Sequence, residues 1–113
     1  MKHIFYQDIA EQKVQEEEAK GVYIRVLIGP DDGAKNFVMR RFRVQPGGHT
    51  PRHQHEWEHE VYVLSGKGEL GTADGPRTIK AGDVVFIPGG EIHQFKNLEN
   101  SDLEFLCLIP END

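Results

Sequence analysis

The sequence predicts an all-β sandwich or barrel, and three observations support this fold class. Short runs of β-branched and aromatic residues recur along most of the chain, a composition typical of strands. Clusters of glycine, proline and aspartate separate these runs at regular intervals and provide turns. A doubly wound α/β fold would need long helices alternating with the strands, and the pattern does not supply them.

The N-terminal segment is the least regular part of the chain. Residues 1–10 contain the apolar cluster Ile4-Phe5-Tyr6 and are expected to pack as an arm or an edge strand. Residues 11–20 are mostly polar, which predicts either a short helix or an exposed connection. We interpret the run Glu16-Glu17-Glu18 within them as a solvated face.

The remaining chain divides into short strands bounded by turns. We expect Pro46-Gly47-Gly48 to end the strand that begins at Phe37, and Pro88-Gly89-Gly90 to aim the strand after it inward. The expected strands are Tyr23–Ile28, Phe37–Val44, His59–Leu64, Glu69–Leu70, Arg77–Ile79, Val84–Ile87, Ile92–Lys96 and Leu103–Ile109. This organisation predicts one domain over residues 1–113, with an arm at 1–20 and a barrel at 21–113.

Composition limits the classes of partner. The formal net charge of −6 argues against a nucleic-acid or anionic-membrane surface. No apolar run approaches the ~20 residues of a membrane span, and the N-terminus lacks the pattern of a signal peptide. Cys107 is the only cysteine among the 113 residues, so an internal disulfide is excluded. These features predict a cytoplasmic protein with no nucleic-acid or membrane partner.

Four histidines form the one group of residues that suggests chemistry. His53 and His55 lie two residues apart, so on a strand they point to the same face and can share a metal. His59 lies four residues beyond His55, a distance of roughly 13 Å on a straight strand. The chain must therefore bend over residues 56–58 if His59 is to join them. His93 must arrive from a distant segment, as a closed barrel allows.

The spacing of these histidines resembles the two motifs of the cupin superfamily. Residues 47–66 follow the first motif, G-x5-H-x-H-x3,4-E-x6-G, with His59 where most cupins have glutamate. Residues 82–97 match the second motif, G-x5-P-x-G-x2-H-x3-N, at every fixed position. Further segments are similar to those of small single-domain cupins that bind manganese with four histidines. The resemblance implies a double-stranded β-helix, the jelly-roll barrel of the cupins.

Glu60 is the alternative to His59 as the fourth ligand, because some cupins have four residues between the second histidine and the glutamate. The register favours His59, which leaves six residues before Gly66, whereas Glu60 leaves five. Neighbouring strand residues face opposite ways, so only one of the two is expected to bind. We interpret the remaining histidines, His3 and His49, as lying outside the site.

Strand alternation then predicts the walls of a pocket beside the metal. If His93 faces inward, Phe95 shares its face, and the resemblance favours Phe105 and Cys107 as inward residues of the last strand. Cys107 is expected to be a buried, unreactive thiol rather than a nucleophile. Arg40 lies on one of two possible inward faces, and an inward arginine needs an anionic partner. Trp57 in the bend is expected to cap the pocket or shield the site.

The predicted function is a metal site beside an apolar pocket. Imidazole ligands suit Mn, Fe, Ni, Cu or Zn, and the resemblance favours one Mn2+ per chain. Four neutral ligands leave open positions for a small-molecule ligand, which favours an oxygenase-like enzyme. A non-enzymatic metal or ligand-binding module and a Lewis-acid isomerase or lyase remain alternatives.

The expected oligomer is a homodimer. A small antiparallel barrel leaves sheet edges that need covering. The apolar arm at Ile4-Phe5-Tyr6 and the strand Tyr23–Ile28 are the candidates to lie across a two-fold interface. The resemblance to dimeric small cupins points the same way.

Overall fold

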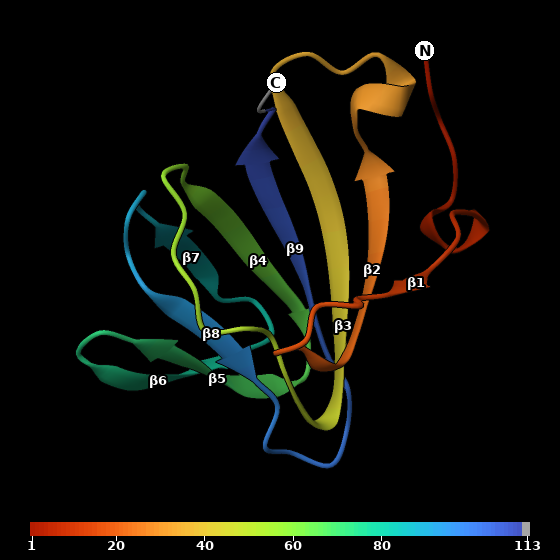
Figure 1. The fold of residues 1–113 in the computed structure, drawn as a ribbon. Coiled ribbons are helices and arrows are strands. Elements are labelled where there is room, and N and C mark those ends of the chain that lie inside the picture. Colours follow the sequence, from red (N-terminus) through yellow and green to blue (C-terminus); the bar gives the residue numbers. More distant parts are fainter. Residues whose placement is uncertain (112–113) are drawn as a thin grey trace.

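Nine antiparallel strands curl into an open barrel in the computed structural model, which describes residues 1–111 (Figure 1). The strands are β1 (Gln12–Lys13), β2 (Lys20–Ile28), β3 (Phe37–His49), β4 (His59–Ser65), β5 (Lys67–Thr72), β6 (Gly75–Lys80), β7 (Val84–Ile87), β8 (His93–Lys96) and β9 (Leu103–Pro110). Two short 3-10 turns, η1 (Tyr6–Asp8) and η2 (Pro30–Asp32), complete the described elements. The all-β fold class is therefore confirmed.

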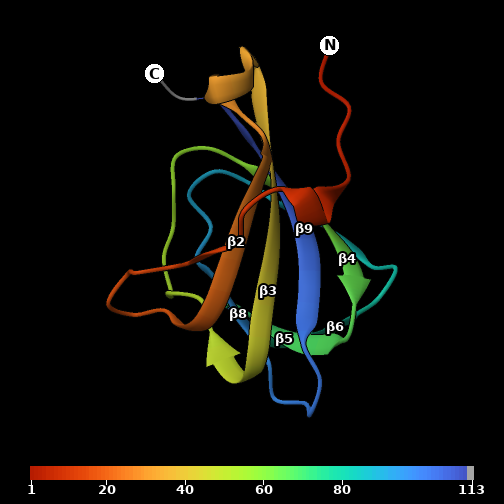
Figure 2. The same ribbon diagram turned by 90° about the vertical axis from the view of Figure 1, so that its right-hand side faces the viewer.

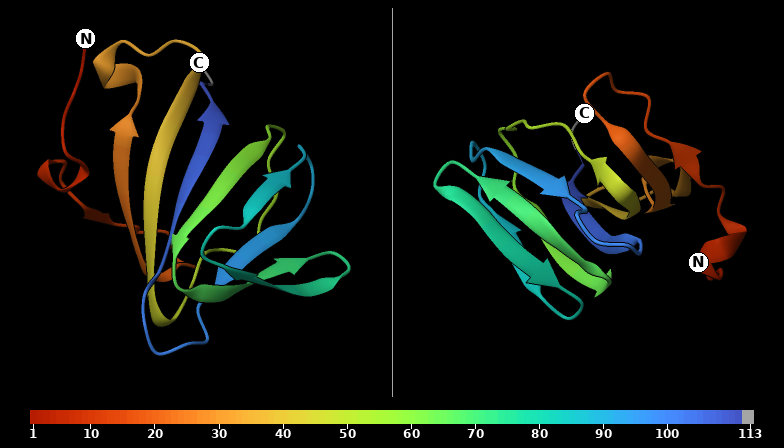
Figure 3. Two further views of the ribbon diagram at one scale, coloured as in Figure 1. Left: turned by 180° about the vertical axis from the view of Figure 1, so that it is seen from behind. Right: turned by 90° about the horizontal axis from the view of Figure 1, so that it is seen from below.

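The strand order β6-β5-β8-β3-β9-β4-β7 leaves β6 and β7 as free edges at the two ends of this path, and β2 and β1 extend the sheet from β3 as a branch. Seen from below, β5, β6 and β8 form one layer, and β2, β3 and β9 form the other (Figure 3). The long strand β3 belongs to both layers, because it pairs with β9 over most of its length and with β8 at its end. The curl therefore brings β8, which carries His93, opposite β4 and β9.

The strand predictions are confirmed with small shifts at their ends, except at β3. We expected the turn signal Pro46-Gly47-Gly48 to end this strand, but β3 continues to His49. The pairing with β2 jumps from Val22 opposite Val44 to Lys20 opposite His49, so the extra residues form a bulge. A bulge tolerates a proline without an N–H because its residues leave the ladder.

The N-terminal segment folds back along β2 rather than forming a helix (Figure 2). Of the two expectations for residues 11–20, the helix is wrong and the exposed connection, with the two-residue β1, is what the structure shows. Tyr6 lies beneath two guanidinium groups, 3.9 Å from Arg41 and 5.5 Å from Arg25. Arg43 forms an ion pair with Glu11 at 2.8 Å, so both apolar and charged contacts hold the arm.

The core lies between the two layers and consists of alternate strand residues. Phe105, Leu103 and Val44 are almost completely buried, and their outward neighbours are not. Asn97 is also fully buried, and its amide donates to the carbonyls of Val44 and Ser101. The asparagine of the second motif thus stabilises the connection between β8 and β9. Within residues 1–111, no helix is long and apolar enough to span a membrane.

Candidate metal centre

His53 and His93 are brought together by an isolated antiparallel bridge between segments far apart in the chain. The His53 N–H donates to the His93 carbonyl at 3.2 Å, and the His93 N–H donates to the His53 carbonyl at 2.9 Å. Their ring centroids are 4.9 Å apart. Backbone pairing therefore fixes the separation of these two imidazoles.

His55, two residues beyond His53, lies in the same cluster, and the chain bends directly after it at residues 56–57. The His55 ring centroid lies 4.3 Å from that of His53 and 5.8 Å from that of His93. One nitrogen from each of these three histidines lies within 4.8 Å of the others. The indole of Trp57 stacks on the His55 ring with centroids 4.4 Å apart and planes 6° apart, so it shields this ligand candidate.

The turn at Pro88–Gly90 holds this bend in place. The Gly90 N–H donates to the His55 carbonyl at 2.6 Å. A side chain at Gly89 would collide with the carbonyl oxygen of Glu56, so only glycine permits this close approach. We expected this turn only to aim His93, but it also positions the segment that carries His55.

His59 completes the cluster from the first position of β4. Its side chain is 6 % exposed, and its ring centroid lies 5.3 Å from that of His55 and 4.8 Å from that of His93. Its nitrogens fall outside the tight group of three donors. Glu60 is exposed and pairs with Leu108 and Phe86 on the outer face of the sheet. The structure therefore places His59, and not Glu60, beside the other three histidines.

Cys107 and Arg40 lie directly behind His59. The His59 Nδ1 atom is 3.3 Å from the Cys107 Sγ atom, and the Arg40 guanidinium donates to the same sulfur at 3.0 Å. His59 Nε2 is buried and has no hydrogen-bond partner within residues 1–111. When Nδ1 carries the proton toward the sulfur, Nε2 keeps its lone pair, the form a metal requires.

His93 has a similar arrangement. Its Nδ1 atom lies 3.0 Å from the Glu91 carbonyl oxygen, which can only accept a hydrogen bond. The proton must therefore be on Nδ1, and Nε2 is left with its lone pair. Both buried histidines of the cluster thus have a neighbour that favours a metal-binding tautomer.

The environment keeps the four histidines neutral. Burial is the main cause in each case, because it disfavours the charged imidazolium. Burial, assisted by neighbouring histidines and by the positive charge of Arg40, lowers the pKa of His53 to about 4 and that of His59 to about 3. Neutral imidazoles are the form in which histidine binds a metal.

The histidines open onto a cavity of about 290 Å³ with apolar walls. Phe95 and Phe105 are 5 % and 1 % exposed, and their rings stack with centroids 4.4 Å apart. The Arg40 guanidinium lies over the Phe42 ring at 4.9 Å, and its Nε atom is buried without a partner within the described residues. The walls of this cavity include Arg40, Trp57, Phe95, Phe105 and Cys107.

Several lining residues were not anticipated, among them Val14, Glu16 and Thr50. Val14 and Glu16 reach the cavity from the connection between β1 and β2, and Thr50 reaches it from the end of β3. Glu16 is exposed, in keeping with our interpretation of a solvated face, and it also lines this cavity, where its negative charge partly offsets the lowering of the His55 pKa by burial. Val14 is the single apolar residue between positions 11 and 18. This isolated apolar residue was the one signal in the sequence that the segment packs against the barrel.

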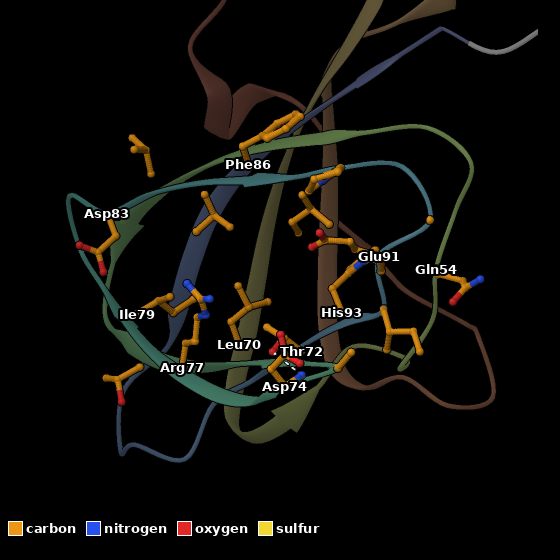
Figure 4. Close-up of a pocket in the computed structure, with 18 of the residues that line it drawn as sticks. Gln54, Leu70, Thr72, Asp74, Arg77, Ile79, Asp83, Phe86, Glu91 and His93 are labelled. Atoms are coloured by element: carbon orange, nitrogen blue, oxygen red, sulfur yellow. Dashed lines mark hydrogen bonds between the residues drawn. The ribbon is translucent and has the colours of Figure 1, made fainter.

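A second and larger hollow, of about 970 Å³, lies at the free edges of the sheet, between β6 and β7. Figure 4 shows Leu70 and Ile79 projecting into it, with Asp83 and Gln54 toward its outer limits. His93 forms part of its wall as well as part of the histidine cavity. Its charged residues, including Arg77 and Asp83, are spread around the hollow rather than gathered at one point (Figure 4).

The histidine cluster fits a divalent transition metal. The three donors lie within 4.8 Å of one another, the scale of a site in which ligands bonded at ~2.1 Å are at most ~4.2 Å apart. The buried, unpartnered His59 Nε2 supplies a fourth candidate donor. The Glu91 carbonyl and the Cys107 sulfur behind the rings are hydrogen-bonding partners of the kind found around metal-ligating histidines.

The Cupin domain family model matches residues 40–109 of the chain. The chain is also similar to the polyketide cyclase RemF from Streptomyces resistomycificus, at 40 % identity and a TM-score of 0.93. That structural match covers 97 % of this chain and 79 % of RemF.

Two curated relatives match shorter segments. The oxalate-binding protein of Thermotoga maritima is 43 % identical over 73 residues, which are 64 % of this chain and 60 % of the relative. The 1-methylthio-D-xylulose 5-phosphate methylsulfurylase of Rhodospirillum rubrum is 35 % identical over 71 residues, 63 % of this chain and 46 % of that protein. The matches thus span about half the length of these relatives, whose names describe different chemistries.

Proposed function

Since the chain belongs to the cupin family, we propose that it uses one divalent transition metal, held by His53, His55, His59 and His93. The convergence of the four rings, with two Nδ1 atoms engaged elsewhere, supports this ligand set. Mn2+ is the metal favoured by the resemblance to four-histidine cupins, and imidazoles also suit Fe, Ni, Cu and Zn.

The reaction that we propose is Lewis-acid catalysis on a small carbonyl compound: formation of an enolate and of a new carbon–carbon bond within the same molecule. A bound divalent ion would polarise a carbonyl oxygen. The carrying observation is the cavity itself, where the four histidines face stacked phenylalanines and a guanidinium. The 40 % identity to a polyketide cyclase over nearly the whole chain supports this class of chemistry.

The side chains of the cavity have separate roles in this proposal. Phe95 and Phe105 hold the apolar body of the substrate and exclude water. Arg40, whose Nε atom is buried without a partner in the described residues, donates to an oxygen that gains negative charge. Trp57 keeps His55 in position by stacking on it. The cavity volume of about 290 Å³ suits a small substrate, since ligand pockets begin at ~300 Å³.

An oxygenase-like reaction is the second candidate. The apolar wall formed by Phe95 and Phe105 beside the histidines favours it, because such a wall would protect an activated oxygen species from water. The Cys107 sulfur argues against it, because a thiol 3.3 Å from a ligand candidate is an easily oxidised group.

A turnover experiment separates these candidates. The metal-loaded protein is incubated with a linear 1,3-dicarbonyl compound, with and without dioxygen, and the products are identified by mass spectrometry. Cyclised or dehydrated product formed equally without dioxygen supports the Lewis-acid proposal. Product that needs dioxygen and contains its oxygen would support the oxygenase, and binding without turnover would indicate a binding module.

We also propose that the protein is a homodimer. The arm residues Ile4 and Phe5 and the β2 residues Val26 and Ile28 remain exposed despite being apolar. Exposed apolar side chains on these two segments would be covered by a partner chain. The arm and β2 are the segments that the sequence indicated for this role.

A further inference from the structure

The connection between β1 and β2 is held across the mouth of the histidine cavity. The Val14 N–H donates to the Val22 carbonyl at 2.9 Å, and the Ala19 N–H donates to the Glu16 carbonyl at 3.0 Å. Val14 and Ala19 both pack against the core. The two ends of the connection are therefore anchored, and Glu16 is fixed between them.

Glu16 differs from the two glutamates that follow it. Glu16 lines the cavity, whereas Glu17 and Glu18 form the tip of the turn and do not. All three glutamates are exposed to solvent. Among the cavity-lining residues of the described chain, Glu16 has the only carboxylate.

The cavity thus combines one negative and one positive side chain. Glu16 approaches from the mouth, while Arg40 lies in the β3 wall behind His59 and beside Cys107. A substrate between them would meet a proton acceptor on one side and donors for a developing oxyanion on the other. Removal of a proton from carbon requires this division of roles.

We propose that Glu16 is the catalytic base that removes a proton from the carbon next to the substrate carbonyl. This inference deepens the proposed function and rests on it. The Glu16 carboxylate takes the proton, the electrons of the C–H bond form a C=C bond, and the carbonyl π electrons move onto oxygen. The negative oxygen faces the histidines and Arg40. Glu16 later returns its proton to the product, so the cycle consumes no other reagent.

Deuterium exchange tests this role without knowledge of the natural substrate. The probe is ethyl acetoacetate in D2O, and mass spectrometry measures how fast the carbon between its carbonyls gains deuterium. In metal-loaded protein, Glu16→Gln should slow the protein-dependent exchange ~100-fold or more, the lower range of general-base effects. Its metal content and its dissociation constant for the probe should equal those of the wild type.

Glu18→Gln is the matched control, since it removes the same charge from the same turn outside the cavity. It should exchange at the wild-type rate.

The outcomes distinguish the catalytic role of Glu16 from the proposed function on which it rests. Wild-type exchange in Glu16→Gln, or loss of its metal, would overturn the catalytic role of Glu16 and leave the proposed function standing. Equal slowing of the exchange in Glu16→Gln and Glu18→Gln would show a general effect of charge. That result would also overturn the catalytic role of Glu16. Failure of the wild type to exceed the buffer rate would contradict the proposed function itself, and the role of Glu16 with it.

Discussion

The histidine cavity and the larger hollow, the cleft between β6 and β7, share His93 as part of their walls. They differ in volume and in how their polar groups are arranged. The cleft has more than three times the volume, about 970 Å³ against about 290 Å³. The smaller cavity has its polar groups pointed at one another, with three donor nitrogens within 4.8 Å. Convergence of candidate ligands, rather than volume, is the reason that we propose the functional site there.

The largest expected effect is loss of metal when a histidine of the cluster is replaced. His59→Ala should weaken metal affinity by more than the ~10–100-fold typical of changes behind the ligands, because it removes a donor itself. Arg77→Ala, in the larger cleft, should leave the affinity unchanged. Competition with a chelating dye measures both.

Glu60→Ala provides the control for register. This variant should keep its metal, since Glu60 is exposed on the outer face of the sheet. Metal loss in Glu60→Ala with retention in His59→Ala would show that the fourth ligand was assigned to the wrong residue.

Acid should lower the free energy of unfolding of the protein through the histidines of the cavity. The folded-state pKa values of about 4 for His53 and about 3 for His59 lie below the ordinary value of ~6.5. Between these limits the unfolded chain binds protons that the folded chain does not, so the free energy of unfolding falls as pH falls from ~6.5 toward 3–4. Urea unfolding of the metal-free protein across this range measures the slope.

Two substitutions locate the origin of that slope. His53→Gln should reduce the loss of stability on acidification, because a group that gains a proton only in the unfolded state has been removed. His3→Gln should not, since His3 lies exposed in the arm. An identical slope in both variants would mean that other groups cause the acid sensitivity.

A smaller effect on metal affinity is expected from residues that hydrogen-bond to the candidate ligands. Cys107→Ala removes the acceptor that lies 3.3 Å from His59 Nδ1, so metal affinity should fall ~10-fold, at the low end for such positions. Cys107→Ser keeps a hydrogen-bonding group there and should recover most of the affinity. Equal affinity in Cys107→Ala and the wild type would show that the sulfur does not orient His59.

Substitutions on the outer surface should have the smallest effect on metal binding. Val26→Glu places a charge in the proposed dimer interface and should shift the protein toward monomer, with unchanged metal content. Leu98→Glu alters a more exposed apolar residue in the loop after β8 and should leave the dimer intact. Sedimentation at micromolar concentration measures the mass, and a monomeric wild type would refute the dimer.

The sequence predicted the strands and the clustering of histidines because both depend on local signals. Alternation put Phe105 and Cys107 on one face of β9, and the family resemblance favoured that face as the inward one; both residues are buried. The spacing of His53, His55 and His59 required a bend, which the structure shows at residues 56–57. The cupin motifs supplied the long-range link to His93.

The features that sequence missed depend on tertiary contacts. The proline and glycines at 46–48 have the composition of a turn, and only their pairing with β2 shows that they form a bulge. Glu16 lies in a charged run that is indistinguishable from a solvated face until Val14 anchors it over the cavity. The larger cleft arises because β6 and β7 do not pair with each other, which no single segment reveals.

Metal analysis of the protein purified without added metal tests the central claim most directly. The account predicts one divalent transition metal ion per chain, lost when His53, His55, His59 and His93 are replaced together and retained when Arg77 and Asp83 of the larger cleft are replaced. A wild-type protein that neither contains a metal nor binds Mn2+, Fe2+, Ni2+, Cu2+ or Zn2+ stoichiometrically would contradict it, as would a fully retained metal in the four-histidine variant.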